Sequence, residues 1–140
     1  MSILTNEYLY QKGAGAVDLA NDTIKAVLLD NTYTQNKDHT AYSDVSGSEV
    51  SGTGYTAGGK EITGKAWVKN NTGDYAWLDC DDLSWSSITV SGVTQLALID
   101  TTVSNLLIGV WDINNSPLNP SNGTLDIQID ANGLLRSAQA

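Results

Sequence analysis

A period-two alternation of apolar and polar side chains in the second half of the chain constrains the fold more than any other feature. Between Lys60 and Lys69 the even positions are small or apolar from Ile62 onwards, and the odd positions are polar or aromatic. A second alternating run follows from Asp74 to Cys80. Because successive residues of a strand point to opposite faces, both runs predict β-strands.

The residues between these runs, Asn71-Thr72-Gly73, are typical of a three-residue hairpin loop. Such a loop needs one residue in the left-handed conformation, and Gly73 is the expected position. The register that follows pairs Val68 with Ala76, Ala66 with Leu78, Gly64 with Cys80, Lys69 with Tyr75, Trp67 with Trp77 and Lys65 with Asp79. It predicts a tryptophan pair beside an opposite-charge pair on one face of the hairpin.

Other short runs of strand-forming residues are separated by turn residues. They cover residues 23–30, 84–90, 93–99, 106–112, 124–130 and 134–136. Ser91-Gly92 predicts a two-residue turn, and Asn132-Gly133 predicts another. About eight short strands at this spacing predict an all-β fold, an antiparallel β-sandwich or a partly closed barrel.

The length of 140 residues fits a single domain. We expect residues 1–20 to form an N-terminal arm or a short helix that begins after Thr5 as N-cap. Residues 21–140 then form the β-sandwich domain, which contains a Gly/Ser-rich loop at 43–59. That loop holds five of the thirteen glycines.

The charge of the chain excludes some partners. Sixteen acidic residues against seven basic ones give a net charge of −9, which repels nucleic acid phosphates and acidic membranes. No apolar run reaches the roughly 18 to 20 residues needed to span a bilayer. The start of the chain does not resemble a signal peptide, and the single cysteine, Cys80, forms no intrachain disulfide, so we expect synthesis in the cytoplasm.

Two strings in the Gly/Ser-rich loop resemble phosphate-binding signatures. Residues 52–57 match a dinucleotide fingerprint, but no buried strand precedes them and no helix follows. Residues 54–60 match most of a nucleotide-binding loop, but Glu61 stands where that loop has a Ser or Thr. We therefore expect no cofactor, and we assign these glycines to turns and close backbone approach.

No catalytic or metal-binding set emerges from the sequence. His39 lies in a polar loop without a nucleophile motif, and Cys80 falls on the expected core face. The aspartates from Asp79 to Asp82 are close in sequence, and Asp112 begins a calcium-like loop that Pro117 interrupts. We favour solvated turns over a calcium site, and we expect no enzyme activity.

The aromatic residues suggest a binding surface. Trp67, Tyr75 and Trp77 would lie on one face of the predicted hairpin, where they could stack on a sugar or pack at a subunit interface. We favour the interface, because the apolar cluster at the N-terminus also needs a cover. The expected interface residues are Ile3, Leu4, Tyr8, Tyr10, Glu49, Tyr55, Trp67, Tyr75 and Trp77.

Three segments together resemble a family of small virion structural proteins of tailed bacteriophages. They are DTIKAVLLDNTYT, SDVSGSEVSGTGYTAGG and the closing ANGLL, with Glu49 to Tyr55 as the most specific part. The resemblance implies a β-rich protein of the virion, made in the host cytoplasm, that decorates or cements the capsid surface or forms the base of a head fibre. It identifies no catalytic residue.

The leading hypothesis is therefore a capsid decoration protein that forms a homo-oligomer, with a trimer favoured, and binds the major capsid protein or other virion subunits. Removal of residues 1–10 is expected to abolish particle binding and to leave the domain folded. The alternative is a carbohydrate-binding or fibre module that recognises host glycans. A hydrolase is the least favoured hypothesis, because it requires a carboxylate pair that sequence spacing does not reveal.

Overall fold

The computed structural model describes residues 2–130 and 133–138, and these fold into an antiparallel β-sandwich with one short α-helix. The elements are β1 (Ser2–Leu4), α1 (Asn6–Gly13), β2 (Ile24–Leu29), the 3-10 turns η1 (Tyr42–Asp44) and η2 (Ser46–Ser48), β3 (Lys60–Glu61), β4 (Ala66–Asn70), β5 (Tyr75–Asp79), β6 (Leu83–Ile88), β7 (Gln95–Asp100), β8 (Leu106–Asp112), β9 (Gly123–Ile127) and β10 (Leu135–Ala138). The all-β prediction is confirmed.

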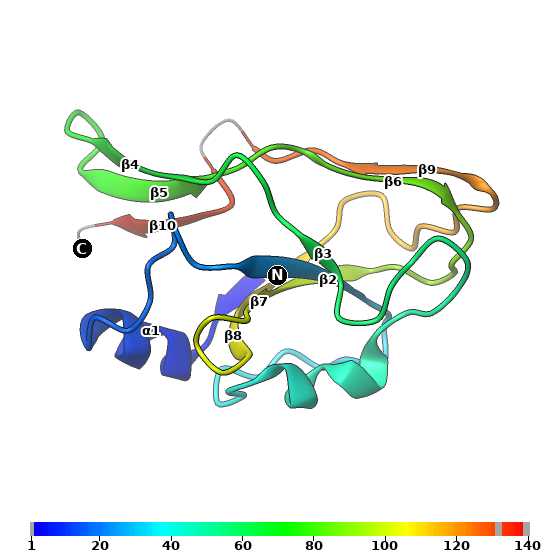
Figure 1. Cartoon of the computed structure of the whole chain (residues 1–140), viewed down its shortest axis with the longest axis horizontal. Coiled ribbons are helices and arrows are strands. Elements are labelled where there is room, and N and C mark those ends of the chain that lie inside the picture. The colour runs from blue at the N-terminus through cyan, green and yellow to red at the C-terminus, as the bar shows by residue number, and fades with distance from the viewer. Residues whose placement is uncertain (1, 131–132, 139–140) are drawn as a thin grey trace.

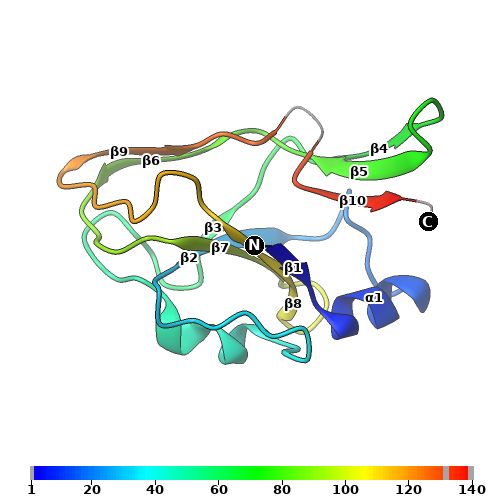
Figure 2. The ribbon, with the colours of Figure 1, turned by 180° about the vertical axis from the view of Figure 1, so that it is seen from behind.

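The strands form two layers (Figure 1). One layer is a five-stranded sheet in the order β1-β8-β7-β2-β3. The other layer consists of two smaller sheets, β10-β5-β4 and β6-β9, which lie side by side across the first. The 3-10 turns lie on the opposite face of the five-stranded sheet, so this sheet is covered on both sides (Figures 1 and 2).

Double coverage explains the apolar character of the central strands. Along β2, Ile24, Ala26 and Leu28 face the core between the two layers, as expected from their spacing. Val27 and Leu29 point the other way, into a second cluster beneath the 3-10 turns. Every residue of β7 is buried, which matches the continuous apolar run of a strand covered on both faces.

The N-terminal segment is part of the sheet. β1 pairs with β8, and Thr5 then begins α1, because its side chain accepts a hydrogen bond from Tyr8 N at 3.1 Å. The same hydroxyl donates to Leu107 O on β8 at 2.6 Å. The helix is short, as expected, and lies next to β1 and β8 (Figure 2).

The predicted register of the β4–β5 hairpin is wrong by one residue. The loop contains four residues rather than three, because Asn70 Oδ1 accepts hydrogen bonds from Thr72 N and Gly73 N at 2.9 and 2.8 Å. Asp74, with φ 56, takes the left-handed position instead of Gly73. The observed pairs are Asn70 with Tyr75, Lys69 with Ala76, Val68 with Trp77, Trp67 with Leu78 and Ala66 with Asp79. Trp67 and Trp77 therefore lie on opposite faces, and the expected tryptophan and charge pairs do not form.

The connection at Ser91-Gly92, predicted as a two-residue turn, does not join a pair of hydrogen-bonded strands. β6 pairs with β9, and β7 pairs with β2 and β8, so the Ser91-Gly92 connection joins the two layers. Gly92, with φ 73, redirects the chain there. At the second predicted turn, Asn132 lies outside the described residues, while Gly133 has φ 85 and donates its N–H to Asp130 O at 2.8 Å.

Candidate functional site

The Gly/Ser-rich loop is held against both layers of the sandwich. Val50 N donates to Leu28 O on β2 at 3.0 Å, and Thr89 N donates to Thr53 O at 2.8 Å. Gly59 lies so close to β2 that a Cβ atom there would be 2.1 Å from Ala26 O. The glycines of this loop thus permit close backbone approach, as the sequence indicated.

Glu49 is the centre of a hydrogen-bonded cluster within this loop, which we call the Glu49 clasp. Tyr42 donates to one carboxylate oxygen, and Tyr55 Oη and Gly58 N donate to the other at 2.6 and 2.8 Å. Tyr55 Oη also accepts from Leu28 N at 3.1 Å, which connects the clasp to β2.

The two tyrosines of the clasp stay protonated at neutral pH. Burial and the hydrogen bond to Glu49 raise the pKa of Tyr42 to about 12, and they raise the pKa of Tyr55 further. Both hydroxyls are therefore donors to the carboxylate. Glu49 and Tyr55, which we expected at an interface, both have these partners within the domain.

The expected N-terminal interface residues divide into buried and exposed groups. Ile3 and Tyr8 are buried in the domain, and Leu4 is half-buried. Tyr10 is 69% exposed, and its neighbour Leu9, which the sequence-based list omitted, is 53% exposed. Removal of residues 1–10 would take away β1 and a fully buried tyrosine, so from the structure we expect this deletion to destabilise the domain as well as to affect binding.

Trp67 on β4 is 37% exposed and faces the helix. Lys12 of α1 places its Nζ 4.6 Å from the centre of the Trp67 ring, where a cation is attracted to the aromatic face. The same ammonium group donates to Ser137 Oγ on β10, and burial lowers its pKa. Lys12 thus links α1 to the β10-β5-β4 sheet. We call the exposed residues Leu9, Tyr10 and Trp67 the α1–β4 surface.

Tyr75 and Trp77 remain together on the other face of β5. Their ring centres are 5.5 Å apart at 51°, and the Arg136 guanidinium lies 4.5 Å from the Tyr75 ring. A Cβ atom on Gly133 would come within 2.2 Å of the Trp77 ring, so the chain before β10 covers that ring. Because of the one-residue change in register, Trp67 lies on the opposite face from Tyr75 and Trp77. The three aromatic residues therefore do not form the single surface that the sequence predicted.

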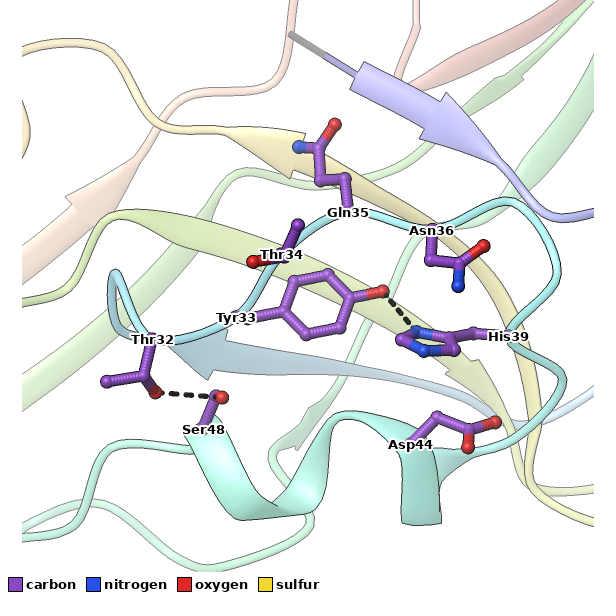
Figure 3. A pocket seen from close by; sticks show the side chains of 8 residues that line it. All are labelled: Thr32, Tyr33, Thr34, Gln35, Asn36, His39, Asp44 and Ser48. Carbon is purple, nitrogen blue, oxygen red and sulfur yellow. Dashed lines mark hydrogen bonds between the residues drawn. The ribbon is translucent and has the colours of Figure 1, made fainter.

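A polar pocket of about 410 Å³ lies between the segment after β2 and the 3-10 turns (Figure 3). Its lining residues are Thr32, Tyr33, Thr34, Gln35, Asn36, His39, Asp44 and Ser48. Tyr33 Oη and His39 Nδ1 form a 2.9 Å hydrogen bond, and Thr32 Oγ1 donates to Ser48 Oγ at 2.9 Å.

The hydrogen bonds described among the residues that line this pocket do not join a nucleophile to a base. Asp44 Oδ2 accepts from Thr40 N and Ala41 N, and these bonds lower the pKa of its carboxyl group. His39 contacts a tyrosine hydroxyl rather than a serine or cysteine nucleophile. The arrangement can hold a small polar group by hydrogen bonds, and it orders the loop that covers the second core cluster.

The remaining candidates from the sequence are dispersed. Cys80 is a buried free thiol, and burial with the charges of the neighbouring aspartates raises its pKa to about 11. Asp81 Oδ2 accepts from Thr63 Oγ1, and Asp82 Oδ1 accepts from Ile129 N. Within residues 2–130 and 133–138, no group of three or more His, Cys, Asp or Glu side chains has metal-binding geometry. None of the described helices is long and apolar enough to cross a membrane.

No protein family, curated protein or solved structure matches the chain.

Proposed function

We propose that this protein is a capsid decoration or cement protein of a tailed bacteriophage, which binds the head shell through non-covalent contacts. The observation that carries the proposal is the α1–β4 surface, which exposes the three large apolar side chains Leu9, Tyr10 and Trp67. The resemblance of the sequence to virion proteins of tailed bacteriophages is the reason for proposing a phage head as the partner.

The α1–β4 surface has the properties of an interface. Tyrosine and tryptophan are enriched at protein contacts because they bury a large area at a low cost in side-chain entropy. Thr5 and Lys12 fix both ends of α1 on the sandwich, so Leu9 and Tyr10 are presented by a positioned helix. A preorganised surface loses less entropy on binding.

The charge of the protein supports a protein partner. A net charge of −9 complements basic patches on a shell and steers the encounter, and it opposes direct contact with nucleic acid. We propose the major capsid protein or another virion subunit as the partner. We further propose a homo-oligomer, with a trimer favoured, on the capsid surface.

The alternative function, glycan binding by a fibre or adsorption module, has one supporting observation. The Tyr75–Trp77 pair with Arg136 over the Tyr75 ring combines an aromatic face and a hydrogen-bond donor. Titration of tryptophan fluorescence with host glycans tests this alternative, and a saturable change that Tyr75→Ser removes would favour it over capsid decoration.

The main test measures binding to particles that lack this protein. The double variant Leu9→Ser/Tyr10→Ser changes only exposed side chains, so it should fold normally and lose at least tenfold in affinity, which corresponds to about 1.4 kcal/mol. Tyr75→Ser is the matched control, an aromatic substitution outside the α1–β4 surface. Unchanged binding of the double variant, with its fold verified by circular dichroism, would contradict the proposal.

A further inference from the structure

A buried carboxyl group at the end of β7 has an unsatisfied oxygen atom. Asp100 is 0% exposed, and its Oδ1 accepts from Thr102 N and Val103 N at 3.0 and 3.3 Å. Its Oδ2 is also buried, and no donor of the described residues bonds to it. A charged oxygen without a donor in this position is costly, so an additional group must compensate it.

Asp22 lies in the turn before β2, two residues from Ile24, which is the strand partner of Asp100. Its Oδ2 accepts from Asp18 N at 2.8 Å. Thr23 N donates to Thr102 Oγ1 at 2.9 Å, and Thr101 N donates to Thr23 O at 2.9 Å. These bonds tie the turn that contains Asp22 to the turn after β7.

The remaining charged groups around Asp100 do not neutralise it. Asp100 pairs with Ile24 on β2 and therefore points to the same face of the sheet as that residue. Lys25, the only charged residue of β2, points to the opposite face, as does its partner Glu61 on β3. Lys60 of β3 donates to Ser84 O instead. On β8 the titratable side chain is Asp112, at the far end of the strand, and residues 101–105 carry none. Asp18 faces Asp22 with its backbone N–H and adds a further acid to this turn.

We propose that Asp22 and Asp100 share one proton, and that this proton acts as a pH-sensitive latch between the α1–β2 connection and the β7–β8 turn. Two ionised carboxylates have no donor between them, but one proton lets one carboxyl donate to the other. The pair then carries a single negative charge. Loss of the proton to solvent leaves two negative charges, one of them fully buried, and repulsion weakens the contact between the two turns.

The expected pH dependence follows from this arrangement. Burial, then the hydrogen bond and the charge of Asp22, raise the pKa of Asp100 from 3.8 to about 7. Because the pKa is higher in the folded chain than in the unfolded chain, the latch stabilises the fold fully below about pH 4. This stabilisation is lost as the pH rises towards 7. The latch is independent of the proposed function.

The test is urea unfolding between pH 4 and 9 of the unchanged protein, Asp100→Asn and a control. Asparagine keeps the acceptor for Thr102 N and Val103 N, and its amide donates to Asp22 at every pH. Relative to Asp100→Asn, the folding equilibrium constant of the unchanged protein should fall by up to about tenfold per pH unit between pH 4.5 and 6.5, then level off above about pH 7.5. Asp126→Asn, on the exposed face of β9, should not reproduce this difference.

A ratio between the two proteins that stays constant above pH 4.5 would overturn the latch. If Asp100→Asn does not fold, carboxyl NMR titration of the unchanged protein decides instead. A titration of Asp100 near pH 7 supports the shared proton, and one near pH 4 overturns it.

Discussion

Glu49→Ala should destabilise the domain by removing the centre of the Glu49 clasp. The substitution takes the acceptor from the hydroxyls of Tyr42 and Tyr55 and from Gly58 N. Hydrogen bonds to a charged group contribute about 1.5 to 3 kcal/mol each, and less where water can replace the partner. Tyr42 and Gly58 are partly exposed, whereas Tyr55 lies against β2. The expected loss is therefore about 2 to 5 kcal/mol in the free energy of unfolding.

Urea unfolding followed by circular dichroism measures this loss. With a slope of about 2 kcal/mol per molar urea, the midpoint should fall by about 1 to 2.5 M. Glu49→Gln retains one acceptor oxygen without the charge, so its loss should be smaller. Glu61→Ala, an exposed glutamate on the edge strand β3, is the matched control and should change stability by less than about 0.5 kcal/mol.

A loss below about 0.5 kcal/mol for Glu49→Ala, equal to the control, would refute the account of the clasp. The residue would then be available for an intermolecular contact, as the sequence suggested. Hydrogen exchange gives a second readout, because the Gly58 amide should be protected in the unchanged protein and exchange much faster in Glu49→Ala.

Three further predictions concern buried positions. Tyr8→Phe should leave stability unchanged or raise it by up to about 1 kcal/mol in thermal unfolding, because the Tyr8 hydroxyl is buried without a hydrogen-bond partner in the described chain; a loss above 1 kcal/mol would reveal a missed partner. Gly59→Ala should cost about 2 to 4 kcal/mol, since its φ is +85° and a Cβ would meet Ala26 O at 2.1 Å; Gly47→Ala, in open space, is the control. Cys80 should react with a thiol reagent at pH 8 only after unfolding, because burial raises its pKa to about 11; rapid reaction in native buffer contradicts its placement.

The fold class was predictable because strand periodicity is local. The alternation in the run that became β5 reflects Leu78 packing on the core, and the continuous apolar character of β2 reflects burial of both its faces. The register was not predictable from the turn sequence alone, because the Asn70 side chain bonds to the loop and adds one residue to it. The partner of β6 could not be predicted for a different reason, because β9 is distant in sequence and no turn between the two strands signals their pairing.

For the candidate sites, too, the sequence predicted the type of residue but not its position in the fold. Composition indicated that aromatic residues form a binding surface, and Tyr10 and Trp67 are exposed. The sequence could not distinguish them from Ile3 and Tyr8, because burial depends on where α1 and β1 dock. The Asp22–Asp100 pair had no signal in the sequence, since the β2–β7 pairing brings together residues that are far apart in the chain.

The number of copies of this protein in purified particles, determined by quantitative mass spectrometry against the major capsid protein, distinguishes decoration of the shell from other positions in the virion. Decoration of the shell predicts a fixed ratio of this protein to the major capsid protein, with copies on each capsomer. This ratio should fall sharply for Leu9→Ser/Tyr10→Ser and stay unchanged for Tyr75→Ser. Absence from the particle, or a copy number as low as that of a tail or fibre subunit, would contradict the account.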